Sequence, residues 1–241
     1  MENVLIKPLY YYSLLSFILT LILLLFSPIW AVVNVLALIC VWSRVPGFIH
    51  YIFNRLALND FFTFIVAVSL GGWIGVAFGT FVTMFARIFG PYEYFPYTVR
   101  ATIAISIAAL FTPLIVAYTG SANWVAFLLY ETVMYFVYYL LVIVFWREEI
   151  GLELALIPAV IFFDYALNSI LLQLFGTTIA NMLTGNIQSG WPFIIFAGLL
   201  LGLWMIVKNG NKIAKRLVKY RNRLKLDENK FIKKLEKTLQ N

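Results

Sequence analysis

Two acidic residues, Glu131 and Asp164, lie well inside long apolar stretches of this 241-residue sequence. Tyr135 and Tyr138 follow Glu131 by four and seven residues, so both hydroxyls would share its helix face. Asn168 follows Asp164 by four residues and would likewise lie one helical turn away on the same face. A carboxylate, an amide and phenols on neighbouring helices could together contact a polar ligand or a proton. We therefore treat these residues as a candidate binding site.

The same carboxylates also fit a purely structural interpretation. An ionisable side chain in an apolar membrane helix costs about 2.5–3.5 kcal/mol on insertion scales, so it is kept only where it pairs or functions. Glu131 or Asp164 could pair with Arg87 or Arg100, or be protonated inside the bundle. In that case they would hold helices together and bind nothing.

Arg100 and Asp60 are two further charged residues at the edges of apolar stretches. Arg100 follows an aromatic segment at 91–97 and could receive an anionic headgroup or substrate at the mouth of a helix. Its alternative role is an anchor facing the cytoplasm. Asp60 follows Asn59 at the start of an apolar run, which is typical of a helix cap.

Several kinds of chemistry have no sequence signature here. The chain has one histidine and one cysteine, so neither a His-rich metal site nor a cysteine cluster can form within it. The sequence contains no HExxH helix, no phosphate-binding loop and no GxSxG elbow. We expect no metal, no cofactor and no enzymatic activity, with a lipid-modifying membrane enzyme as the least favoured alternative.

The residues around these positions are strongly apolar. Hydrophobic residues make up 63% of the chain and charged residues 12%, against about 25% charged in ordinary soluble domains. Seven apolar runs are long enough to form membrane segments or large parts of them. The runs cover residues 9–26, 29–42, 60–89, 101–119, 123–146, 152–175 and 191–207. The sequence therefore predicts an all-α, polytopic transmembrane helical bundle.

The run at 60–89 is longer than one membrane crossing needs. As one helix it would extend about 45 Å at 1.5 Å per residue, and Gly71-Gly72 lies near its middle. It is either one tilted helix or two short helices that turn at the glycines, which gives seven or eight membrane segments. On a continuous helix, Gly71, Gly75 and Gly79 would form one face for close helix packing.

The positive charges favour the broken form, because short cytoplasmic loops carry an excess of Lys and Arg. With a break at Gly71-Gly72, the Lys and Arg residues between the segments all fall on the same side as the C-terminal tail. We therefore predict eight segments in the cell membrane with both termini in the cytoplasm.

The chain divides by composition into a transmembrane domain, residues 1–207, and a basic tail, residues 208–241. The tail has twelve Lys and Arg residues against three acidic ones. An apolar stripe recurs at helical spacing, is interrupted at 227–229 and then resumes, so the tail is predicted to form two short amphipathic helices. The stripe consists of Ile213, Leu217, Tyr220 and Leu224, and then of Phe231, Leu235 and Leu239. Such a helix suits anionic lipid headgroups at the bilayer surface rather than nucleic acid.

One region resembles a known family. Leu56-Ala-Leu-Asn-Asp-Phe-Phe, then Ser69-Leu-Gly-Gly-Trp-Ile-Gly and Gly79, is similar to the early region of substrate-binding S-components of energy-coupling-factor (ECF) vitamin transporters. Trp73 stands where that family usually has proline. The resemblance implies a small helical bundle that captures a micronutrient. It also implies docking on an ATPase-driven module through small-residue faces, such as that of Gly75 and Gly79.

The glycine pattern is also similar to small bacterial shape-determining membrane subunits, which organise partners and bind no solute. Two functions therefore remain open. The first is a solute-binding or transport component that acts with partner subunits in the lipid bilayer. The second is a structural or assembly subunit of a membrane complex.

Overall fold

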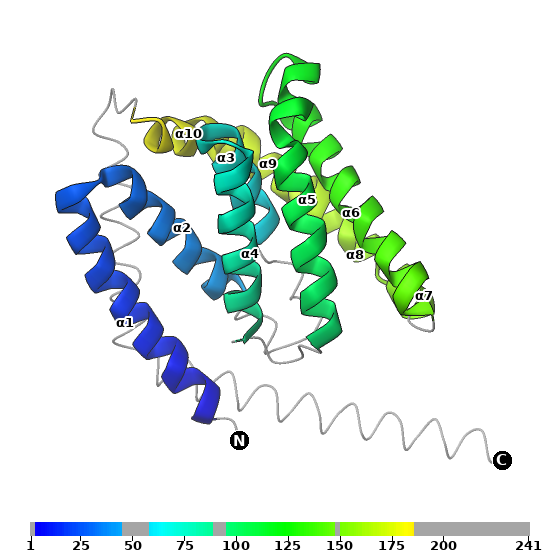
Figure 1. Cartoon of the computed structure of the whole chain (residues 1–241), viewed down its shortest axis with the longest axis horizontal. Coiled ribbons are helices and arrows are strands. Elements are labelled where there is room, and N and C mark those ends of the chain that lie inside the picture. The colour runs from blue at the N-terminus through cyan, green and yellow to red at the C-terminus, as the bar shows by residue number, and fades with distance from the viewer. Residues whose placement is uncertain (1–2, 45–57, 89–94, 148–149, 186–241) are drawn as a thin grey trace.

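The computed structural model of the chain describes residues 3–44, 58–88, 95–147 and 150–185 (Figure 1). Within these ranges every regular element is helical and no strand is present. The all-α class is therefore confirmed for this part of the chain. The predicted segment at 191–207 and the basic tail at 208–241 lie outside the described residues, so they remain predictions.

The first two helices form an antiparallel hairpin. Helix α1 covers Asn3–Phe26 and α2 covers Pro28–Ser43, with Pro28 at a first-turn position where a missing N–H costs nothing. The Asn34 amide donates to the Ser16 carbonyl oxygen (2.9 Å) and to the Thr20 hydroxyl (2.8 Å). These polar contacts join α1 to α2.

The structure confirms the predicted break at Gly71-Gly72. Helix α3 covers Asn59–Leu70, and α4 covers Gly72–Ile88. Gly71 between them has φ +103°, a conformation that side chains other than glycine rarely adopt. The chain reverses direction at Gly71. As a result, Gly75 lies against Ala67 and Gly79 lies against Thr63 of α3.

Two expectations for this hairpin need correction. The N-cap residue of α3 is Leu58, which has no side-chain oxygen, so Asp60 lies in the first turn of the helix and is not its cap. Gly71 serves the turn, and a Cβ at this position would meet nothing within 4 Å, unlike one at Gly75 or Gly79. Of these three glycines, only Gly75 and Gly79, both in α4, therefore allow close packing against α3.

Two long helices form the middle of the bundle. Helix α5 covers Phe95–Thr119 and α6 covers Trp124–Phe145, joined by a short connection in which Asn123 caps α6 through a 3.0 Å bond from the Ala126 N–H. Helix α5 packs against both α4 and α6. Its Ser106 shares a 2.9 Å hydrogen bond with Thr80 of α4.

The last described region is a series of helical segments that runs back along α6 and ends beside α3 (Figure 1). Residues Ile157–Leu183 form one nearly continuous helix in which two stretches are wound as π-helix. The segments are α7 (Ile150–Ala155), α8 (Ile157–Val160), η4 (Ile161–Leu167), α9 (Asn168–Leu171), η5 (Leu172–Gly176) and α10 (Thr177–Leu183).

Large apolar side chains lie on the outside of the described bundle, and many polar side chains lie inside it. Within the described residues, three helices are long and apolar enough to cross a membrane: Phe95–Thr119, Trp124–Phe145 and Ile157–Leu183. Large apolar side chains such as Leu25, Phe136 and Phe162 are exposed on the outer faces, whereas many polar and charged side chains are buried inside. Together with the three apolar helices, these exposed apolar side chains are compatible with a membrane protein.

Candidate functional site

The buried face of α6 carries the predicted site. Buried residues recur along it every three or four positions and include Phe127, Tyr130, Glu131, Tyr135 and Tyr138. This spacing follows the helical period, so the side chains form one stripe that faces the other helices. Near its start, Phe64 of α3 packs on Phe127 and Tyr130 with ring centroids 5.3 and 5.4 Å apart.

Glu131 is fully buried in this stripe. Neither of its carboxylate oxygens has a hydrogen-bond partner within the described part of the chain. The Tyr130 hydroxyl, also fully buried, has none there either. Buried polar groups in folded proteins are nearly always hydrogen-bonded, and a buried carboxylate without a partner is costly. Glu131 is therefore the residue in the described core that most needs an explanation.

The last helix brings Asp164 and Asn168 to the same region. Asp164 lies in η4 with 3% of its surface exposed, and Asn168 opens α9 with 2% exposed. The Tyr135 hydroxyl of α6 donates to Asp164 Oδ2, and the Tyr135 ring stacks on Tyr165 at 5.9 Å. The structure thus joins the two predicted halves of the site through Tyr135.

The π-helical winding gives this region a second distinctive feature. Asp164 lies within η4, and Asn168 lies between η4 and η5. π-helical turns are rare and occur frequently at functional sites, because the widened helix places side chains where an α-helix would not. Asn168 Nδ2 has no hydrogen-bond partner among the described residues.

Two further acidic residues lie near Glu131. Asp60 of α3 and Asp164 of η4 are close enough to Glu131 to interact with it electrostatically, and each also interacts with other residues of the chain. Within the described residues, no group of three His, Cys, Asp or Glu side chains is placed to hold a metal ion.

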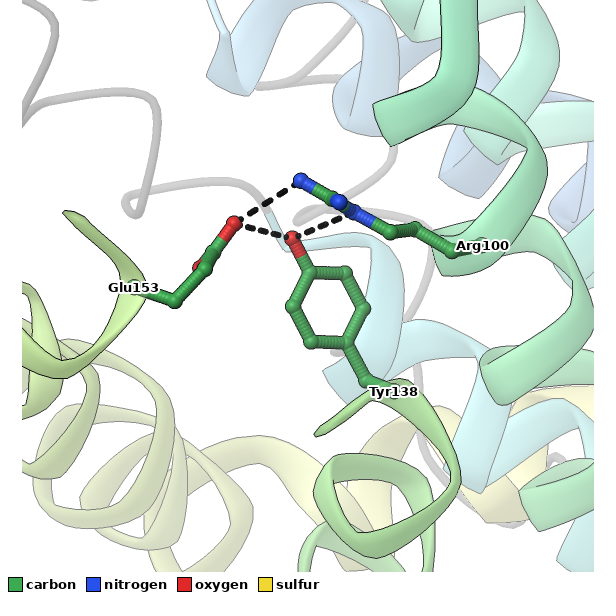
Figure 2. Close-up of polar contacts among 3 residues, drawn as sticks. All are labelled: Arg100, Tyr138 and Glu153. Atoms are coloured by element: carbon green, nitrogen blue, oxygen red, sulfur yellow. Dashed lines mark hydrogen bonds and ion pairs between the residues drawn. The ribbon is translucent and has the colours of Figure 1, made fainter. Parts of the chain in front are cut away.

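Arg100 belongs to a second, neighbouring cluster (Figure 2). Its Nη2 donates to Glu153 Oε1 of α7 at 2.9 Å, and its Nε donates to the Tyr138 hydroxyl at 3.2 Å. The same hydroxyl donates to Glu153 Oε1 at 2.8 Å, which closes a three-residue network. The guanidinium also lies over the rings of Tyr97 (3.8 Å) and Trp146 (5.5 Å).

This placement differs from two expectations for Arg100, an open position at the mouth of a helix and an ion pair with Glu131 or Asp164. The side chain is fully buried rather than open at the mouth of a helix, and the partner that the structure gives it is Glu153, neither Glu131 nor Asp164. Charge-assisted hydrogen bonds and aromatic faces satisfy a guanidinium well in such surroundings. Arg100 therefore joins α5, α6 and α7 at one end of the bundle.

Glu153 is the site residue that sequence reasoning missed. It follows the hydrophilic segment at 147–149, so it resembles the end of a loop, yet it is fully buried. Its position just after the start of the apolar run at 152–175 was the available signal. Tyr135 and Tyr138, whose rings meet edge to face at 6.3 Å, connect the Glu153 cluster to the Asp164 cluster.

No family model, curated protein or solved structure matches this chain. The role of the site therefore follows from the burial, contacts and charges of its own residues.

Proposed function

We propose that this protein is an integral membrane protein that binds a small polar solute inside its helical bundle, as a component of a transport system. The observation that carries the proposal is Glu131, a fully buried carboxylate without a hydrogen-bond partner in the described part of the chain. A solute that binds there would supply the missing partner.

The membrane assignment is supported by the arrangement of polarity. Three described helices have the length and composition of membrane spans, and their outer faces expose large apolar side chains. Buried charges such as Arg100 and Glu153 pair with each other inside, which is how ionisable groups are tolerated in lipid. We extend this to eight membrane segments in the cell membrane with both termini in the cytoplasm, on the strength of the Lys and Arg distribution.

Solute binding is supported by buried polar side chains on three elements that contact one another. Helix α6 contributes Glu131, η4 contributes Asp164, and α9 contributes Asn168. The Nδ2 donor of Asn168 and the oxygens of Glu131 are buried and lack partners among the described residues. Binding sites of membrane transport proteins are built in this way, from polar groups on irregular helices near the middle of the bilayer.

We also propose that the chain acts with partner subunits, as its resemblance to ECF S-components implies. Gly75 and Gly79 do not offer a docking face in this structure, because they pack against Ala67 and Thr63 of the same chain. A partner would contact another surface, and anionic lipid headgroups would contact the basic tail at 208–241.

The experiment is purification of the full-length protein in a mild detergent, followed by identification of whatever accompanies it. A solute released on denaturation, together with an ATPase partner, is the result we expect. Absence of a solute, with a cell-envelope or respiratory protein as the only companion, would favour the structural subunit. That alternative draws support from Arg100, Tyr138 and Glu153, which bond to one another within the chain.

A further inference from the structure

We propose that the interior site takes an organic cation, a solute with an ammonium or amidinium group that pairs with Glu131. This inference rests on the proposed function and specifies the chemical class of its solute. Two observations support it. The first is the chemistry of the side chains around Glu131, and the second is a comparison with the cluster around Glu153, in which Arg100 is the cation.

The Arg100 cluster shows how this bundle accommodates a cation. The guanidinium pairs with the Glu153 carboxylate at 2.9 Å and lies over the rings of Tyr97, Tyr138 and Trp146 at 3.8, 5.2 and 5.5 Å. A carboxylate provides the charge, and the aromatic faces provide cation–π attraction away from water. The chain thus completes one carboxylate and aromatic cluster with its own side chain.

The region around Glu131 has the same chemistry. Carboxylates come from Glu131 and Asp164, and aromatic rings come from Tyr130, Tyr135 and Tyr165. In contrast to Glu153, Glu131 has neither an ion pair nor a hydrogen bond within the described residues. Aromatic side chains near a carboxylate are a common means of recognising organic ammonium groups.

The kind of cation follows from the side chains near Glu131. Because no three acidic, His or Cys side chains of the described part are placed to surround a metal ion, the arrangement favours an organic cation over a multivalent metal ion.

The test uses the full-length protein in nanodiscs of zwitterionic lipid and two probes of nearly equal shape, benzylammonium and benzyl alcohol. Binding is followed by thermal unfolding as a function of probe concentration. We expect saturable stabilisation by benzylammonium and none by benzyl alcohol. Glu131→Gln should weaken the benzylammonium effect about tenfold or more, because a charge-assisted contact is lost.

Phe136→Leu is the matched control, because Phe136 lies on the exposed face of α6, five residues after Glu131. This variant should respond to benzylammonium as the wild type does. Equal responses to the two probes, no saturable response to either, or an unchanged response in Glu131→Gln would each overturn the cation proposal.

The experiments distinguish failure of the proposed function, solute binding, from failure of the cation proposal. If the solute that accompanies the purified protein depends on Glu131 but is neutral or anionic, solute binding stands and the cation proposal is wrong. If no solute accompanies the protein and benzylammonium does not bind, both proposals are wrong.

Discussion

Arg100 Nη2 lies 2.9 Å from Glu153 Oε1, and both side chains are fully buried. The pair connects the first turns of α5 to α7, the short helix that precedes the last long helix. Tyr138 bonds to both partners from α6. Three consecutive helices are therefore held together at one end of the bundle by one buried network.

Removal of one partner from this network should be strongly destabilising. Glu153→Leu would leave the Arg100 guanidinium buried without its carboxylate, and such losses cost about 3–5 kcal/mol. The double variant Arg100→Met with Glu153→Leu should recover much of that loss, because no uncompensated charge remains. Thermal unfolding in mild detergent measures both. Additive effects of the two single changes would show that the residues are not coupled.

Gly75 should tolerate no larger side chain. A Cβ at this position would lie 2.4 Å from Ala67 Cβ, so Gly75→Ala must push α3 and α4 apart. Overpacking of this kind costs about 1–3 kcal/mol. Gly151→Ala is the matched control in a helix, since a Cβ there meets nothing within 4 Å, and it should be neutral or stabilising by about 1 kcal/mol. Equal unfolding temperatures for the two variants would contradict the close packing.

Asn34 should hold α1 on α2. Asn34→Leu removes its bonds to Ser16 and Thr20 and should cost about 1 kcal/mol, in the range measured for polar contacts between membrane helices. Thr20→Val removes one of the same bonds, so the double variant should be less destabilised than the sum of the singles. Additivity in thermal unfolding would argue against a shared hydrogen bond.

Topology can be tested by cysteine labelling in a Cys40→Ala background. Ser121 lies exposed in the connection between α5 and α6, and Arg147 lies exposed after the end of α6. The proposed orientation places Ser121 outside the cell and Arg147 inside. Ser121→Cys should react with an impermeant maleimide on intact cells, and Arg147→Cys only after permeabilisation. The reverse pattern would invert the topology.

Much of the fold could be predicted from local signals. Uncharged runs identified the helices, and Gly71-Gly72 identified the turn, because a glycine pair interrupted a run too long for one crossing. The π-helical winding of η4 and η5 could not be predicted, since it has no residue signature of its own. The number of membrane segments also depends on residues outside those described.

The residues of the candidate site could largely be predicted from the sequence, but the bonds between them could not. Helical spacing placed Glu131 with Tyr135, and Asp164 with Asn168, within single helices. The bond from Tyr135 to Asp164 joins two different helices, so it depends on how they pack. For the same reason, the choice of Glu153 as the partner of Arg100 could not follow from spacing alone.

The role of Glu131 is tested most directly by native mass spectrometry of the full-length protein released from mild detergent. The wild type and Phe136→Leu should carry a bound small molecule, and Glu131→Gln should have lost it while unfolding at a similar temperature. A folded Glu131→Gln protein that retains the same molecule at the wild-type occupancy would contradict the assignment of Glu131 as the solute contact.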